Sequence, residues 1–184
     1  MTKHILFFQG AGDEGYEADK ELVDSLQKNL GKEYDIDYPK INSDESLPDF
    51  GWIKQIENKV AALESDIILV GHSLGASMLL KYLSENPVTQ RVKGVFLIAT
   101  PFWEGNEDWK TGLKLQDDFA YKVPDEIPFF FYHCKDDEEA PFSHLNRYKQ
   151  KLTQATFREI NNGGHQLNND LTPVANDIKS RYIV

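Results

Sequence analysis

Apolar residues along the chain form two kinds of segment that alternate with each other. Four continuous apolar runs are typical of strands buried on both faces of a parallel sheet. Two shorter segments are predicted as further strands, and the first of them is expected near a sheet edge because Pro39 ends it. The six predicted strands are residues 4–8, 34–38, 67–70, 94–99, 129–134 and 155–160.

The segments between these strands place apolar residues at the three- and four-residue spacing of one helix face. The helices predicted there cover residues 17–30, 52–63, 73–86, 141–152 and 171–182. Strands that alternate with helices indicate the α/β class, here a three-layer α/β/α sandwich with a mostly parallel sheet of about six strands. In such sheets, helices cover both faces and ligands bind beyond the carboxyl ends of the strands.

Composition narrows the class of protein. The 184 residues, 40% of them hydrophobic and 27% charged, are expected to form a single domain over residues 1–184. No apolar stretch approaches the ~20 residues that cross a bilayer, and the short N-terminal run lacks the features of a signal peptide. The one cysteine, Cys134, fits a cytoplasmic location. A net charge of −10 argues against nucleic-acid binding, because such a surface repels phosphates.

The most informative motif joins the third predicted strand to the helix that follows it. Gly71-His72-Ser73-Leu74-Gly75 has the pattern G-x-S-x-G. Between a strand and a helix, this pattern exposes the serine hydroxyl on a sharp turn, and the glycines leave room for that turn. The N–H groups that begin the helix favour an oxyanion, which acyl transfer requires. Ser73 is therefore predicted to be a nucleophile.

An acid and a base follow in the expected order. Asp136 and Asp137 come after the strand at residues 129–134, and His165 comes after the last predicted strand. The chain order serine, acid, histidine belongs to the α/β-hydrolases. His72 and His133 are interpreted as structural histidines, since one lies inside the serine motif and the other ends a buried strand.

Over nearly its whole length, the chain resembles the α/β-hydrolase superfamily, and within it the compact serine hydrolases related to retinoblastoma-binding protein 9. The likeness implies that Ser73 attacks an acyl carbon, that His165 transfers the proton, and that an aspartate orients His165. Asp137 is preferred over Asp136 because the superfamily often places an acid four residues before a proline, here Pro141. Asp136 remains the alternative acid.

The resemblance also implies an oxyanion hole and an acyl pocket. The hole would use the backbone N–H groups of Leu74 and Ala11, with Gly10 allowing the turn. The family often has His-Gly at this point, whereas this chain has Gln9 before Gly10. Family members carry a cap after the fourth strand, and here it would be minimal. Phe102 and Trp103 in that segment are expected either to line the substrate pocket or to seal the sheet edge.

The predicted function is hydrolysis of an ester, thioester or small amide through an acyl-enzyme on Ser73, with a small-molecule acyl substrate and no cofactor or metal. One alternative is a non-catalytic binding protein on the same scaffold. Another is dinucleotide binding, because Gly10, Gly12 and Gly15 fit the G-x-G-x-x-G pattern after a strand. Carboxylates at residues 13–14 would repel a pyrophosphate there, which counts against this alternative.

Overall fold

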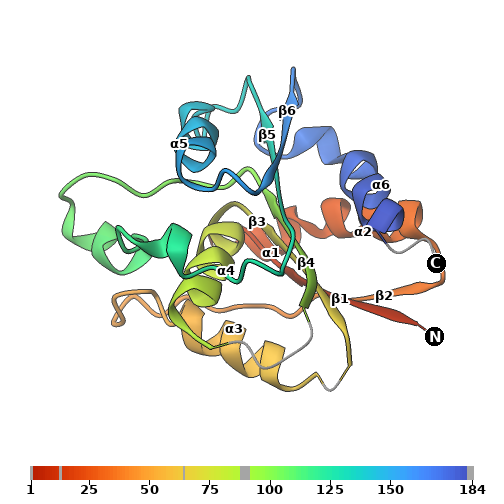
Figure 1. Ribbon diagram of the computed structural model, residues 1–184, viewed down its shortest axis with the longest axis horizontal. Coiled ribbons are helices and arrows are strands. Elements are labelled where there is room, and N and C mark those ends of the chain that lie inside the picture. Colours follow the sequence, from red (N-terminus) through yellow and green to blue (C-terminus); the bar gives the residue numbers. More distant parts are fainter. Residues whose placement is uncertain (1, 13, 64, 88–91, 182–184) are drawn as a thin grey trace.

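A sheet of six parallel strands forms the centre of the molecule, in the order β2-β1-β3-β4-β5-β6 (Figure 1). The computed structural model describes residues 2–12, 14–63, 65–87 and 92–181. The strands are β1 (Lys3–Phe8), β2 (Tyr34–Asp37), β3 (Ile67–His72), β4 (Val92–Ile98), β5 (Phe129–Cys134) and β6 (Thr156–Ile160). The predicted α/β class, strand number and edge position of residues 34–38 are confirmed.

Six α-helices accompany the sheet in the described part of the chain. They are α1 (Gly15–Ala18), α2 (Lys20–Leu30), α3 (Trp52–Ala61), α4 (Ser73–Glu85), α5 (Ser143–Lys151) and α6 (Thr172–Arg181). One hydrophobic core includes buried residues of α3, α4 and α5, and a second core on the opposite face includes those of α2 and α6. Successive strand residues alternate between the two cores, as Phe7 and Phe8 of β1 do, so the four central strands are buried on both faces, while the edge strands β2 and β6 are partly exposed.

The register of the strands aligns their carboxyl ends. Phe8 pairs with Gly71, His72 pairs with Ile98, and Cys134 pairs with Ile160. The loops after β1, β3, β5 and β6 therefore begin at one edge of the sheet, where a ligand site is expected in a parallel α/β fold.

The predicted helix over residues 17–30 is divided in two at Asp19, which both ends α1 and precedes α2. The side chain of Asp19 is 1% exposed and accepts a hydrogen bond from the Gly10 backbone N–H. Because this carboxylate turns into the molecule, the chain leaves one helix and starts the next. The segment between β4 and β5 contains the short 3₁₀ helices η1 (Asp108–Leu113) and η2 (Phe119–Tyr121).

Candidate active site

The turn between β3 and α4 holds Ser73 in an unusual backbone conformation. Its φ of 51° lies in the left-handed region that a residue with a side chain rarely adopts. Neighbouring glycines make this turn fit. A Cβ on Gly71 would lie 2.7 Å from the backbone of α4, and one on Gly75 would lie 2.3 Å from the Gln9 carbonyl oxygen. The strain at Ser73 is the feature that a nucleophile elbow needs.

The structure brings the side chains of Ser73, His165 and Asp137 together. His165 Nε2 lies 2.8 Å from Ser73 Oγ, and His165 Nδ1 lies 2.9 and 3.1 Å from the two carboxylate oxygens of Asp137. The three residues come from the start of α4, the loop after β6 and the loop after β5. The imidazole therefore bridges an alcohol and a carboxylate.

The environment of Asp137 favours its ionised form. Burial opposes ionisation, but the hydrogen bond with His165 and those from the Glu139 and Ala140 backbone N–H groups together hold the pKa of Asp137 below its usual value. For His165, burial disfavours the imidazolium, yet the hydrogen bond and charge of Asp137, with smaller effects of Glu139 and Asp19, raise its pKa above the usual value. The carboxylate thus stabilises the proton that the imidazole would receive from a serine.

Asp136 has a different position. Its exposed carboxylate accepts hydrogen bonds from the Gly163 and Gly164 backbone N–H groups at 3.1 and 2.9 Å. These bonds to the backbone hold the pKa of Asp136 below its usual value. Asp137 therefore makes the contact with the imidazole, while Asp136 shapes the loop that carries His165.

His133 lies behind Asp137 and is completely buried. Its Nε2 donates a hydrogen bond to the Ala140 carbonyl oxygen at 2.7 Å and lies 3.4 Å from Asp137 Oδ2. Burial lowers the pKa of His133, so the neutral ring is favoured. The structure gives His133 a supporting place in the loop that holds the acid.

A second histidine and carboxylate, His72 and Asp19, lie buried beside Ser73. His72 Nδ1 is 2.9 Å from Asp19 Oδ2, and the rings of His72 and His165 are centred 4.8 Å apart. The sequence reasoning missed Asp19. Asp19 lies three residues before Leu22 and seven before Leu26, which puts a carboxylate on the apolar face of the predicted helix. A charged residue at an apolar position was the available signal that Asp19 has a buried partner.

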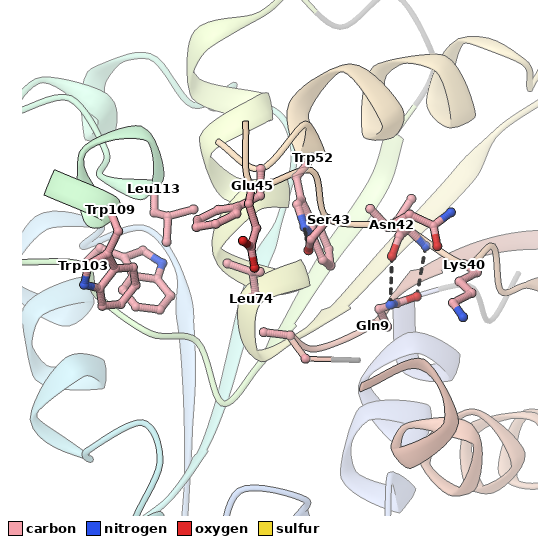
Figure 2. Close-up of a pocket in the computed structure, with 14 residues that line it drawn as sticks. Gln9, Lys40, Asn42, Ser43, Glu45, Trp52, Leu74, Trp103, Trp109 and Leu113 are labelled. Carbon is pink, nitrogen blue, oxygen red and sulfur yellow. Dashed lines mark hydrogen bonds between the residues drawn. The ribbon is translucent and has the colours of Figure 1, made fainter. Parts of the chain in front are cut away.

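The loop after β1 is held against the serine turn. Gln9, which replaces the usual histidine of the family, forms two hydrogen bonds with the backbone of Ile41: its amide nitrogen donates to the carbonyl oxygen, and its amide oxygen accepts from the N–H (Figure 2). Gly10 packs so closely that a Cβ there would lie 3.3 Å from Ser73 Cβ. The loop that contains Ala11 is thereby held close to Ser73, and both residues line one hollow.

Two hollows meet at Ala11 and Gly12. The first, of about 530 Å³, is lined by Ser73, His165 and Gly10 among others. The second, of about 380 Å³, is lined by Leu74 and by apolar side chains that include Trp103. Its remaining lining residues are Gln9, Lys40, Ile41, Asn42, Ser43, Glu45, Phe50, Trp52, Trp109 and Leu113. Figure 2 shows the two tryptophans Trp103 and Trp109 at one end of this pocket and Lys40 at the other.

The two aromatic residues predicted near the substrate have different positions. The indole N–H of Trp103 donates a hydrogen bond to Ser77 Oγ at 3.0 Å, which orients the ring in the pocket beside Leu74. Phe102 packs edge-on against the Tyr148 ring, with centroids 5.0 Å apart, and lines a neighbouring cavity to which Trp103 also contributes. Of the two residues, Trp103 alone lines the pocket that includes Leu74.

The glycine loop differs from a dinucleotide site. The Gly10 backbone N–H, which a pyrophosphate would need, already donates to Asp19 at 2.7 Å. The helix after the loop, α1, is a single turn that ends at Ala18. Asp13, which weighed against a phosphate on sequence grounds, is outside the described residues. The Gly10 N–H is therefore not free to bind a pyrophosphate, and the loop packs against the serine turn.

Within the described part of the chain, no group of three or more histidine, cysteine, aspartate and glutamate residues is arranged to hold a metal ion. The same residues contain no helix with the length and apolar character needed to span a bilayer.

The fold and this arrangement of side chains define an α/β-hydrolase. The sequence profile described as serine hydrolase matches residues 24–171, and the chain belongs to this serine hydrolase family. No curated protein matches the sequence significantly. Membership of the family supports hydrolase activity, and the narrower likeness to relatives of retinoblastoma-binding protein 9 stays a prediction.

Solved structures agree on the fold. The ydeN gene product from B. subtilis has a TM-score of 0.73 at 17% identity, covering 99% of both chains. Est1E from Butyrivibrio proteoclasticus has a TM-score of 0.72 at 13% identity, covering 97% of this chain and 87% of its own. A thioesterase domain from the curacin biosynthetic pathway has a TM-score of 0.72 at 14% identity, covering 97% and 91%. At these identities, the similarity establishes the fold.

Proposed function

We propose that this protein hydrolyses esters, thioesters or small amides of a small acyl substrate through an acyl-enzyme on Ser73. The observation that carries this proposal is the continuous chain of hydrogen bonds from Ser73 through His165 to Asp137, at the serine of a strained turn. A serine hydroxyl needs such a base to become nucleophilic. Asp136, the alternative acid, has no part in this chain of bonds.

In the first half of the reaction, Ser73 Oγ attacks the carbonyl carbon while His165 Nε2 accepts the serine proton. The carbonyl oxygen becomes an oxyanion. When the tetrahedral intermediate collapses, His165 gives the proton to the leaving alcohol, thiol or amine. In the second half, His165 takes a proton from water, the hydroxide attacks the acyl carbon, and the proton returns to Ser73 Oγ. Asp137 keeps Nδ1 protonated, so that Nε2 is free to accept.

The oxyanion would be bound by the backbone N–H groups of Leu74 and Ala11. Leu74 is in the first turn of α4, where N–H groups have no partner inside the helix and the helix dipole favours negative charge. Ala11 borders both hollows, and the small Gly10 beside it allows this loop to approach Ser73. These positions surround the place where charge develops in the transition state.

The apolar pocket beside Leu74 is the natural site for the acyl group. Trp103, Trp109 and Leu113 offer aromatic and aliphatic surface at one end of it. Burial of each additional methylene there stabilises the complex by about 0.8 kcal/mol at most. One structural relative is named a thioesterase domain, so thioesters belong beside oxygen esters in a substrate panel.

The test compares the wild type with Ser73→Ala on p-nitrophenyl esters of graded acyl length and on the matching thioesters. Loss of the nucleophile is expected to lower kcat by a factor on the order of 10⁴–10⁶. Labelling of both proteins with a fluorophosphonate probe separates an enzyme from a binding protein. Labelling of the wild type alone supports the enzyme, and unchanged hydrolysis by the Ser73→Ala protein refutes the assignment. A wild type that neither hydrolyses nor labels favours a binding protein on a hydrolase scaffold.

A further inference from the structure

A second buried histidine and carboxylate lie directly behind the reacting groups. Asp19 and His72 are each 1% exposed, and His72 Nδ1 lies 2.9 Å from Asp19 Oδ2. The other ring nitrogen of His72, Nε2, lies 3.0 Å from the backbone carbonyl oxygen of His165. Asp19 also accepts hydrogen bonds from the Gly10 backbone N–H at 2.7 Å and from the Gln166 side chain at 3.1 Å.

The hydrogen-bond partners determine where the protons are. A backbone carbonyl oxygen only accepts, so His72 Nε2 must carry a hydrogen to bond to His165. Burial opposes the charge on Asp19, but the hydrogen bonds from His72, Gly10 and Gln166 hold its pKa below the usual value, so it is ionised and also accepts. Asp19, the His72 ring and the His165 carbonyl oxygen therefore form one continuous line of buried hydrogen-bonding contacts.

This pair joins three segments that are distant in sequence. Asp19 lies between α1 and α2, and through Gly10 it holds the loop after β1 that would supply one oxyanion N–H. His72 is the last residue of β3 and directly precedes the nucleophile. Its Nε2–H holds the backbone of His165, which carries the base. A shift in any one of these segments changes the distance between the proposed nucleophile, base and oxyanion hole.

Stability alone is a poor reason for such a pair. Taking a carboxylate and an imidazole out of water costs free energy that their contact offsets only in part, and well-packed apolar residues at such sites are often equally stable. The pair contacts the loop after β1, the turn at Ser73 and the loop after β6 that carries His165. Its role is therefore to hold these three segments at fixed distances from one another. Reaction rates are sensitive to such geometry, because a displacement of about 1 Å can cost a factor of 10².

We propose that Asp19 and His72 act together as positioning residues, which fix the oxyanion loop and the His165 backbone relative to Ser73. This inference rests on the proposed hydrolase function and adds two residues that touch neither the substrate nor the reacting atoms. Asp19→Ala removes three acceptor bonds at once. His72→Ala removes the donor to the His165 carbonyl oxygen and leaves Asp19 without its imidazole partner.

Asp19→Asn is the conservative variant. With its amide oxygen in the place of Oδ2, the introduced asparagine still accepts from Gly10 and His72. Its NH₂ group then faces the side chain of Gln166. The buried Oε1 of Gln166 has no partner among the described residues, and it can accept from this NH₂ group once the Gln166 amide has flipped. This variant keeps the geometry and removes the charge, so it should retain much more activity than Asp19→Ala.

The experiment measures kcat and KM for the wild type, these variants and the double mutant Asp19→Ala/His72→Ala, each normalised to correctly folded protein by circular dichroism and thermal unfolding. Asp177→Ala is the matched control, because Asp177 is a partly buried acceptor that bonds instead to Tyr132 and Arg158. We expect kcat of Asp19→Ala to fall by a factor on the order of 10² with KM changed by less than about threefold. The kcat of the double mutant should be no lower than that of the less active single mutant, because the two residues act as a unit.

A purely structural role predicts lower unfolding temperatures for both Asp19→Ala and Asp177→Ala with kcat near the wild-type value, and that result would overturn the proposal. If the wild type hydrolyses no ester in the panel, the proposed function fails separately. Nitrogen-15 NMR of the ring then decides this inference: a hydrogen on Nε2 of His72, with a signal that shifts in Asp19→Ala, supports the pair. An Nε2 signal that does not respond to Asp19→Ala contradicts it.

Discussion

Replacing Asp137 by asparagine tests the role of the acid with little change in shape. Asp137 Oδ1 accepts the Glu139 and Ala140 backbone N–H groups, each at 2.9 Å, so the amide oxygen of the introduced asparagine is expected to take this place. The NH₂ group is then left at the Oδ2 position, 2.9 Å from His165 Nδ1. A donor at this position favours the tautomer of His165 with its hydrogen on Nε2, which faces Ser73 Oγ and cannot accept its proton.

The expected cost follows from this change of tautomer. Loss of the correct tautomer in a serine, histidine and aspartate arrangement lowers kcat by about 10⁴, or roughly 5.4 kcal/mol at 1.36 kcal/mol for each factor of ten. Asp136→Asn is the matched control one residue away. In this variant the new amide oxygen keeps one of the two bonds to the Gly163 and Gly164 N–H groups, so its kcat should stay within about tenfold of the wild type.

The assay is the hydrolysis of a short p-nitrophenyl ester by the two variants at a pH above the acid limb of the wild-type profile, after thermal unfolding has shown that both are folded. The reverse pattern, with Asp137→Asn near the wild type and Asp136→Asn strongly impaired, would refute the assignment of the acid. Equal and small losses would show that neither Asp136 nor Asp137 orients His165.

The pH profile of the wild type and three further substitutions have distinct expected results. The pKa of His165 lies above its usual value of about 6.5, and the base must be neutral, so kcat/KM should fall as the pH drops through that raised pKa. Glu139→Gln removes a carboxylate 3.8 Å from His165 Nε2 and should move the acid limb of kcat/KM to lower pH. An acid limb at the same or a higher pH would contradict a contribution of the Glu139 charge to the raised pKa of His165. Gln9→Met leaves the buried N–H and carbonyl groups of Ile41 without their partner, at about 1–3 kcal/mol each, and should lower the denaturant midpoint. Trp103→Ala should raise KM for long acyl chains and leave acetyl esters nearly unchanged; a uniform loss would place the acyl group elsewhere.

The pattern of the sequence predicted the fold and three of the residues that meet at the site, Ser73, Asp137 and His165. Continuous apolar runs predicted the buried strands, because a strand covered on both faces has no polar side. Ser73 and Asp137 follow such strands, His165 follows the shorter edge strand β6, and a parallel register brings the carboxyl ends to one edge. Their proximity was therefore predictable from chain order and sheet geometry, without knowledge of any side-chain contact.

Other features depend on tertiary packing that local sequence does not encode. Nothing near Gln9 indicates that its amide pairs with the backbone of Ile41, which is 32 residues away. Asp137 was preferred over Asp136 only for its spacing to Pro141, because adjacent residues differ only in where the turn after β5 points each side chain. Phe102 and Trp103 likewise looked equivalent, yet one packs against Tyr148 and the other lines the pocket beside Leu74.

The central claim is that Ser73 becomes acylated, and trapping the acyl-enzyme tests it most directly. The wild type is mixed with a p-nitrophenyl ester, quenched in acid within the first turnovers, digested and analysed by mass spectrometry, with Ser73→Ala treated in parallel. We predict a mass increase of one acyl group on the peptide that contains Ser73 and none in the variant. An acyl group on another residue, or ester hydrolysis by the wild type and the variant at the same rate, would contradict the account.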